Sequence, residues 1–354
     1  MPVINQPPDF AVCKNYLDSL QNIAEDLGLE HIFAHADEEV YARLVQIIWK
    51  HGGLDKNIII LMGGFHQLRV RQRLIFKRHS CIGYKDRFVD AGTISAGSVD
   101  QAFSGKHYYR CMRILKESFN ALIQYRAERL SNNYSTIPVE LRESLENLRE
   151  KPSPETLEEV AGQNAFEEIF EELTSARSPQ QSMTVAYLRD ISSLLALVSA
   201  VREGDFERHL QAERQMLKQV FALDHQNYSR YLTFQHVFLT DLKSSNNKAY
   251  QGLSERGYGA NYSGEKFATV HGDFVTEYFI RETKGTASPF RSGYSTNVDT
   301  TNKWVKTVHI HAKLRLAMRD KLNIKTTSTH KELTDNGKTR HSINVDNLKK
   351  KLYS

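Results

Sequence analysis

The apolar run from Ile58 to Met62 constrains the fold more than any other stretch of the sequence. Five apolar residues, mostly β-branched, stand between the turn-like residues 55–57 and the glycine pair Gly63-Gly64. A run this short, apolar at every position, is typical of a strand that is buried on both faces. The glycine pair allows a sharp turn and the close approach of another group, and helical apolar spacing resumes over 65–77. The stretch therefore predicts a strand, a tight turn and a helix.

The segment before this run has the same pattern. Residues 31–36 are a short strand candidate, and three acids, beginning with Asp37, open a helix that stops at Gly52-Gly53. A strand, a helix and a strand within about 30 residues form a βαβ unit with two parallel strands. Ligands of open α/β sheets bind at the carboxyl ends of strands, where Asp37 and the Gly63-Gly64 turn would lie. The commoner role of an acid at the position of Asp37 is a helix cap, and the spacing alone favours that role.

The rest of the chain is dominated by helical periodicity. It predicts short helices and turns over 83–104 and longer helices over 10–27, 106–130, 183–202, 206–223, 228–242 and 302–321. A strand pattern returns at 267–271, before a helix over 274–282 in which Asp273, Glu277 and Arg281 share one face. We expect a mostly helical α/β protein with about a tenth of its residues in strands, against the usual fifth to a quarter.

Composition limits the class of protein. The 354 residues are 40% hydrophobic and 25% charged, which is ordinary for a globular protein. No apolar run approaches the roughly 18 residues that span a bilayer, and the first eight residues lack the features of a signal peptide. The three cysteines are far apart in the sequence and favour a reducing compartment. We therefore expect an intracellular protein, nuclear or cytoplasmic, without a membrane partner.

Charge is segregated along the chain. Residues 138–176 hold 11 acids and 3 bases, whereas residues 284–354 hold 15 bases and 5 acids. Because prolines and like charges oppose a packed core, we expect 131–181 to be a mobile, partly helical linker. The basic region is compatible with nucleic-acid binding and equally with a solvated surface.

Several short motifs occur together in a fixed order. They are DEEVYA at 37–42, MGGFH at 62–66, SGKHYYR at 104–110, REGDF at 202–206, ALDHQNYSRYL at 222–232 and DFVTE at 273–277. In this combination, over residues 10–325, the chain resembles a large animal family of transposon-derived proteins with a ribonuclease-H-like core. The resemblance implies a partial ribonuclease-H-like core with a small parallel sheet and a large all-α insertion. It divides the chain into a first part of the core (1–83), a helical insertion (84–245), a return to the core (246–325) and a basic C-terminal tail (326–354).

The resemblance also implies a site. In ribonuclease-H-like cores, three carboxylates hold two Mg²⁺ or Mn²⁺ ions that activate a hydroxyl group. Asp37 matches the second catalytic acid and Glu277 the third, with Asp273 one turn earlier as a further metal ligand, so Asp37 and Glu277 should converge. His66, near the same edge, is expected to bond to the backbone. The first acid would lie on an earlier strand, and only nine residues precede Phe10. We therefore expect at most weak Mg²⁺ or Mn²⁺ binding and no strand cleavage.

The implied function is that of a transposase-like protein, ancestrally a metal-dependent DNA strand-transfer enzyme and incomplete or inactive as this chain. DNA is then the expected partner. The candidate nucleic-acid contacts are basic residues of two predicted helices: Arg69, Arg71, Arg73, Lys77, Lys303, Lys306 and Lys313. The alternative is a non-catalytic scaffold that binds nucleic acid or protein.

Overall fold

The computed structural model describes residues 9–50, 57–131, 137–151, 153–165, 178–261, 264–265, 267–277 and 335–352, with single residues 168, 171, 176, 310, 314, 317, 318 and 321. It is mostly helical, as predicted, and divides into two compact units. The first unit comprises Met1–Arg71 and Leu194–Ser328, and the second comprises Gln72–Ser193 and Thr329–Ser354. Two of the three points at which the chain passes from one unit to the other fall inside helices, namely α3 (Gly64–Arg78) and α10 (Pro179–Glu203).

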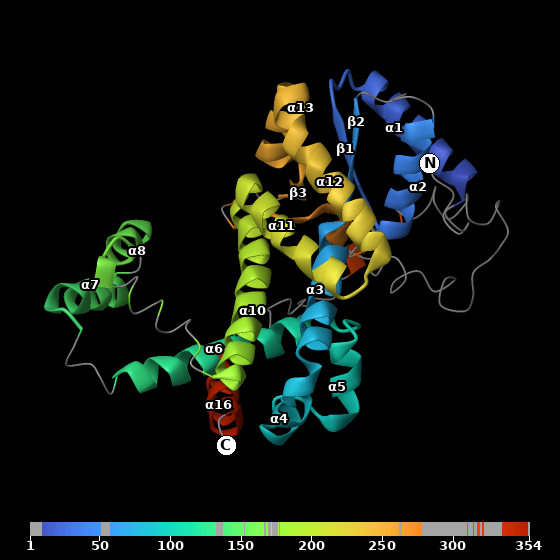
Figure 1. Cartoon of the computed structure of the whole chain (residues 1–354). Coiled ribbons are helices and arrows are strands. Elements are labelled where there is room, and N and C mark those ends of the chain that lie inside the picture. Colours follow the sequence, from blue (N-terminus) through green and yellow to red (C-terminus); the bar gives the residue numbers. More distant parts are fainter. Residues whose placement is uncertain are drawn as a thin grey trace. The chain divides into compact units, whose positions relative to one another are not determined.

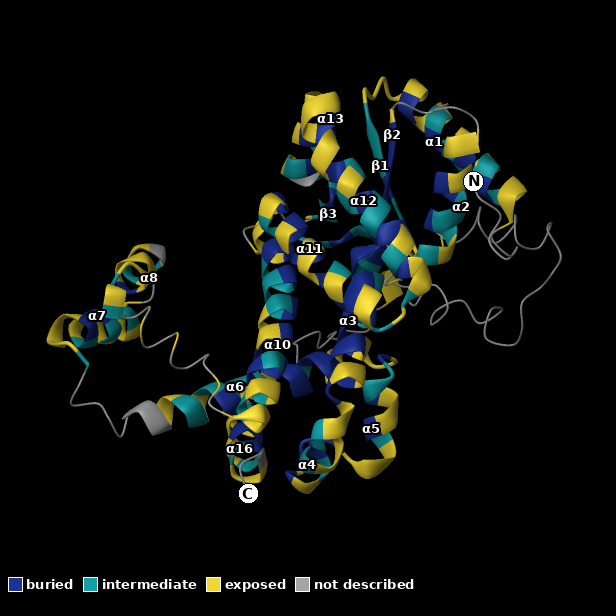
Figure 2. Cartoon of the chain, viewed as in Figure 1, coloured by how far each residue is buried: buried dark blue, intermediate teal, exposed yellow. Residues whose placement is uncertain are grey.

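The first unit contains the predicted βαβ unit. Strands β1 (Ile32–Ala36) and β2 (Ile58–Met62) pair in parallel, and α2 (Glu38–Lys50) connects them (Figure 1). The register sets Ala36 opposite Met62, and the Gly63 N–H donates to the Ala36 carbonyl at 2.6 Å. All five residues of β2 are buried (Figure 2), which confirms the prediction made from its uninterrupted apolar run.

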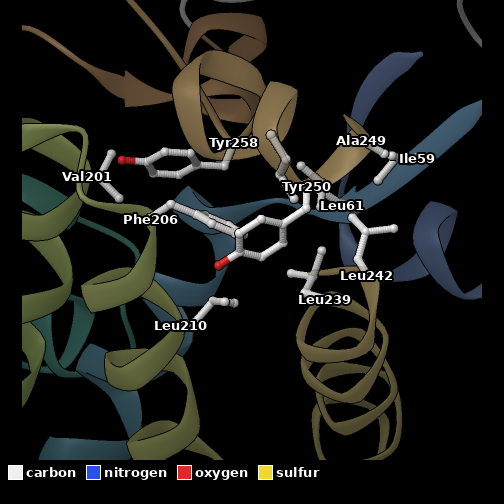
Figure 3. Close-up of a cluster of buried hydrophobic side chains, with 11 residues drawn as sticks. Ile59, Leu61, Val201, Phe206, Leu210, Leu239, Leu242, Ala249, Tyr250 and Tyr258 are labelled. Atoms are coloured by element: carbon white, nitrogen blue, oxygen red, sulfur yellow. The ribbon is translucent and has the colours of Figure 1, made fainter. Parts of the chain in front are cut away.

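Helices cover both faces of these two strands. Helix α1 (Phe10–Asp26) packs with α2 on one side, and α12 (Gln226–Ser245) and α13 (Asn247–Gly252) lie on the other (Figure 1). Because alternate side chains of a strand point to opposite faces, β2 contributes Ile59 and Leu61 to the second side. There they join a buried cluster (Figure 3) with side chains of α10, α11 (Phe206–Ala222), α12, α13, the π-helical turn η3 (Leu253–Gly257) and the residue that follows it: Val201, Phe206, Leu210, Leu239, Leu242, Ala249, Tyr250, Leu253 and Tyr258.

A second, very short pair of strands follows this cluster. Strand β3 (Gly259–Ala260) pairs antiparallel with β4 (Val270–His271), so only the last two residues of the predicted strand over 267–271 pair in a sheet. The predicted helix over 274–282 begins earlier, at residue 272, and is helical to residue 277. Its remaining residues, and most of the predicted helix over 302–321, lie outside the described residues.

The described residues of the second unit form helices joined by turns and short loops, with no strand among them. Its elements are η1 (Ser80–Ile82), α4 (Tyr84–Asp90), α5 (Ala96–Phe103), α6 (Tyr108–Ser131), α7 (Val139–Glu150), α8 (Pro154–Ala161) and α16 (Asp335–Leu352), with parts of α3 and α10. Helix α16 packs on α6 and α4, and its Val345 and Leu348 are buried. The predicted basic tail over 326–354 is therefore corrected: from residue 335 it is a packed helix.

Two other boundaries differ from the prediction. The all-helical insertion over 84–245 is not one compact body, because the apolar faces of α11 and α12 cover β2 in the first unit. The acidic stretch over 131–181 is partly helical, as predicted, and its helices α7 and α8 bury Leu141 and Val160. Its mobility stays a prediction.

One helix of the described residues, α10, is long and apolar enough to cross a membrane by length and composition, and half of its apolar window is buried inside the protein. A core helix meets the same criterion, so this observation is weak evidence for a membrane span.

Candidate functional site

The site lies in the first unit, at the edge where β1 and β2 end. Asp37 directly follows β1, and its Oδ1 accepts the backbone N–H of Val40 at 2.9 Å. The Asp37 carbonyl accepts the N–H of Tyr41 at 2.8 Å. Asp37 is thus an exposed cap of α2, which is the role that its spacing favours.

The turn after β2 receives a carboxylate from a distant part of the chain. Helix α3 begins at Gly64, and the preceding Gly63 has no side chain with which to cap it. Asp273 takes this role: its carboxylate accepts the N–H groups of Phe65 at 3.0 Å and of His66 at 3.1 Å, 208 and 207 residues away. A carboxylate here satisfies two N–H groups of the first turn and faces the positive end of the helix dipole.

The two glycines of the turn make this approach possible. A Cβ atom on Gly63 would lie 2.3 Å from Asp273 Oδ2, and one on Gly64 would lie 2.0 Å from His271 Nδ1. Any side chain at either position would therefore displace the segment that carries His271 and Asp273. The predicted close approach at the glycine pair is confirmed.

His66 lies between two carboxylates. Its Nδ1 is 2.9 Å from Asp273 Oδ2, and its Nε2 is 3.7 Å from Glu277 Oε1. The hydrogen bond to Asp273 raises the pKa of His66, although partial burial opposes this effect. Burial alone would raise the pKa of Asp273, but the bond with His66, the nearby His271 and the two backbone N–H groups lower it. His66 thus bonds to a carboxylate through its ring, and the expectation of a backbone partner for this side chain is wrong.

Three further histidines lie behind this edge. His209 and His271 are buried and His35 is half-buried, and burial lowers the pKa of each, to about 3 for His271. The rings of His209 and His271 are 6.2 Å apart between centroids. A Cβ on Gly272 would lie 2.6 Å from the ring of His35, so this segment approaches β1 as closely as it approaches the turn after β2. The sequence analysis did not predict a role for these histidines. The triplet His271-Gly272-Asp273, in which a glycine separates two polar residues, was the feature that could have indicated a close approach here.

A buried polar network holds the end of β2 from the other side. The Met62 N–H donates to Gln235 Oε1 of α12, and Gln67 Nε2 of α3 donates to the Met62 carbonyl at 3.1 Å. Gln235 Nε2 donates in turn to Glu213 Oε1 of α11 at 2.6 Å. Helices α11 and α12, which lie within the predicted insertion over 84–245, therefore set the position of the strand end.

The carboxylates predicted to hold metal do not form a cluster. Among the described residues, no group of three or more His, Cys, Asp or Glu side chains could hold a metal ion, which corrects the predicted set of Asp37, Asp273 and Glu277. The physical reason is that two of the three are used as caps: Asp37 turns toward its own helix, and Asp273 receives three N–H groups. Within the same residues, no hydrogen bond or ion pair joins Asp37 to Glu277, and their predicted convergence lacks support. As arranged here, these side chains do not fit a two-metal centre.

The predicted nucleic-acid contacts have different environments. Arg71 is fully buried, and its Nη1 donates to the Ala212 carbonyl at 3.1 Å, so it belongs to the core and its predicted DNA contact is corrected. Arg69 is half-buried beside the Phe65 ring, whereas Arg73 and Lys77 are exposed. The other three predicted contacts, Lys303, Lys306 and Lys313, lie outside the described residues.

Comparison with known proteins places the chain in one family without assigning it an activity. No curated protein and no solved structure matches the chain. One family model, a domain of unknown function, matches residues 1–354. The chain therefore belongs to the DUF8702 family.

Proposed function

We propose that this chain is a transposon-derived protein whose ribonuclease-H-like core binds DNA without cutting it. The observation that carries the proposal is the capping of α3 by Asp273, which brings residues 270–277 to the carboxyl ends of β1 and β2. A ribonuclease-H-like core needs such an arrangement, because its last acid lies on a helix after the insertion and must reach the end of a strand. Three of the six motifs that carry the resemblance meet at this edge: Asp37 of the first follows β1, the MGGFH turn ends β2, and the DFVTE segment caps that turn through Asp273.

The proposed loss of cleavage is supported by the contacts of the Asp273 carboxylate. Mg²⁺ requires near-octahedral oxygen ligands and is usually held by one or two carboxylates that can approach it closely. Asp273 is 5% exposed and holds one imidazole and two backbone N–H groups. Re-aiming it toward an ion would uncap α3 and leave these donors without their acceptor. The His66–Asp273 pair therefore supports a structural role for Asp273, in place of the metal-binding role that the resemblance implies.

Binding of DNA is supported by charge. The chain has a formal net charge of +5 at pH 7, and exposed Lys and Arg residues attract the phosphate backbone of a duplex. Such binding weakens steeply with salt, because each neutralised phosphate releases counterions.

Two measurements test the proposal. Fluorescence anisotropy with a labelled duplex should show binding that weakens by about 1,000-fold or more between 50 and 200 mM salt if six or more phosphates are contacted. Incubation of supercoiled plasmid with Mg²⁺ or Mn²⁺ should give no nicked product.

The double variant Asp37→Ala with Glu277→Ala separates binding from catalysis. Both side chains are substantially exposed, and we expect DNA affinity within about threefold of wild type. Metal-dependent nicking by the wild type that this variant loses would establish an active site. Absence of DNA binding at low salt would instead favour a protein-binding scaffold.

A further inference from the structure

The second unit has a concentration of positive charge on one pair of helices. Helices α6 and α16 pack against each other, although they are separated by about 200 residues of sequence. Together they hold ten Lys and Arg residues and four Asp and Glu residues. Sequence reasoning treated the C-terminal charges as a tail and did not connect them with α6.

Two of the four acids of this pair, Glu117 and Glu128, reach from α6 to residues of α16. Glu117 of α6 is 1% exposed, and its Oε1 accepts Asn344 Nδ2 of α16 at 2.9 Å. Arg113 Nη1 and His341 Nδ1 lie 3.6 and 3.7 Å from the same oxygen. Glu128 pairs with Lys349. Glu117 thus holds α16 on α6 from inside the helix pair, whereas the Glu128 carboxylate is 58% exposed, and Asp346 of α16 is exposed as well.

Several cations of the pair face solvent. Arg110 and Lys116 of α6 and Lys350 of α16 are exposed, and within the described part of the chain none has a carboxylate partner. Arg340 is also exposed, and it acts on the buried Glu117 only through its charge. The neighbouring Tyr109 exposes 49% of its surface. These four cations, Arg110, Lys116, Arg340 and Lys350, are called the α6–α16 cations below.

We infer that the α6–α16 cations form a surface for the phosphate backbone of duplex DNA. The inference rests on the proposed function and locates its binding surface in the second unit. Long, exposed, unpaired Lys and Arg side chains contact phosphates, and such contacts carry no direct sequence information. The surface therefore binds duplexes of unrelated sequence with similar affinity, and it depends on α16 remaining folded on α6.

The test replaces the four cations together. The full chain with Arg110→Ala, Lys116→Ala, Arg340→Ala and Lys350→Ala is titrated against two labelled 20-base-pair duplexes of unrelated sequence at several salt concentrations. The slope of log affinity against log salt becomes shallower by about 3 to 4, since each lost phosphate contact removes about 0.9. Affinity near 0.1 M salt falls by about 100-fold or more.

A matched control removes the same amount of charge elsewhere. Lys85, Lys243 and Lys248 are exposed and Lys14 is half-buried. Each of the four forms an ion pair with a carboxylate, in the order Asp100, Glu207, Glu30 and Asp18. Their fourfold replacement by Ala should change the salt slope by less than about 1. Circular dichroism of both variants verifies that they are folded, and the charge-reversing replacement of the same four α6–α16 cations by Glu should abolish binding.

The outcomes distinguish the two proposals. Wild-type protein that binds no duplex at low salt refutes the proposed function. Wild-type binding that both fourfold variants weaken equally, or that the α6–α16 variant retains, refutes this surface and leaves DNA binding by the chain standing. A difference of more than about tenfold between the two unrelated duplexes contradicts a backbone surface.

Discussion

At the scale of single residues, Gly63 shows how one missing side chain determines the site. Gly63→Ala would place a methyl group 2.3 Å from Asp273 Oδ2, and we expect a loss of about 1–3 kcal/mol in the free energy of unfolding. Gly97→Ala is the control, since a Cβ there meets nothing within 4 Å. That change in helix α5 should be neutral or stabilising by up to about 1 kcal/mol. Urea unfolding measures both, and equal effects would contradict the close approach.

His66 reports directly on the Asp273 contact. The hydrogen bond with Asp273 raises the pKa of His66, so the pair stabilises the fold below the ordinary pKa of histidine and loses this contribution as pH rises through the higher folded value. Asp273→Asn should lower the pKa of His66, because the acceptor charge at 2.9 Å is lost. Glu277→Gln should lower it less, since that carboxylate is 3.7 Å away and 47% exposed. NMR titration of the His66 ring measures both changes, and an unchanged pKa in Asp273→Asn would refute the pairing.

At the scale of elements, Glu117 decides whether α16 stays on α6. Glu117→Ala would leave Asn344 Nδ2 buried without its acceptor. We expect the free energy of unfolding to fall by about 2–3 kcal/mol and hydrogen exchange to become faster throughout α16. Glu128 is the matched control on the same helix, because its carboxylate pairs with Lys349 and is 58% exposed. Glu128→Ala should cost less than about 1 kcal/mol. Similar exchange rates of α16 in both variants would show that the buried carboxylate does not anchor it.

At the scale of the whole molecule, the two units should differ in their response to acid. The described histidines whose pKa burial lowers, His35, His209 and His271, all belong to the first unit. A lowered folded pKa means that the unfolded chain takes up the proton first. The contribution of these histidines to stability is therefore complete above 6.5, the ordinary pKa of histidine. It is lost as pH falls toward about 3, the folded pKa of His271. Each proton that only the unfolded chain binds changes the free energy of unfolding by about 1.4 kcal/mol per pH unit.

Hydrogen exchange read by mass spectrometry at pH 7 and pH 5, corrected for the intrinsic rate, measures this difference. Amides of β2 in the first unit should lose protection at pH 5, and amides of α6 in the second unit serve as the internal reference. His271→Gln should reduce the loss in β2. Equal losses in β2 and α6 would contradict the assignment of the acid response to these histidines.

The sequence predicted most elements within a few residues of their observed bounds, because their signals are local. An uninterrupted apolar run such as Ile58–Met62 can be satisfied only by burial on both faces. Helix α11 begins at Phe206 as predicted, because the preceding Asp205 caps it by accepting the N–H of Arg208. The role of Asp37 as a cap is local in the same way. Such features depend on residues three or four positions apart, which the sequence displays directly.

Tertiary structure alone decided the composition of the site and the division into units. Arg71 and Arg73 are both basic residues of α3, and Arg71 is the one that is buried and donates to the Ala212 carbonyl of α11. The bond from Phe65 N to Asp273 joins residues 208 positions apart, and the contact of α16 with α6 has a similar separation. Periodicity determines which face of a helix or strand is apolar. Periodicity does not identify the segment that packs on that face, because the packing of the whole chain determines which distant segment lies there.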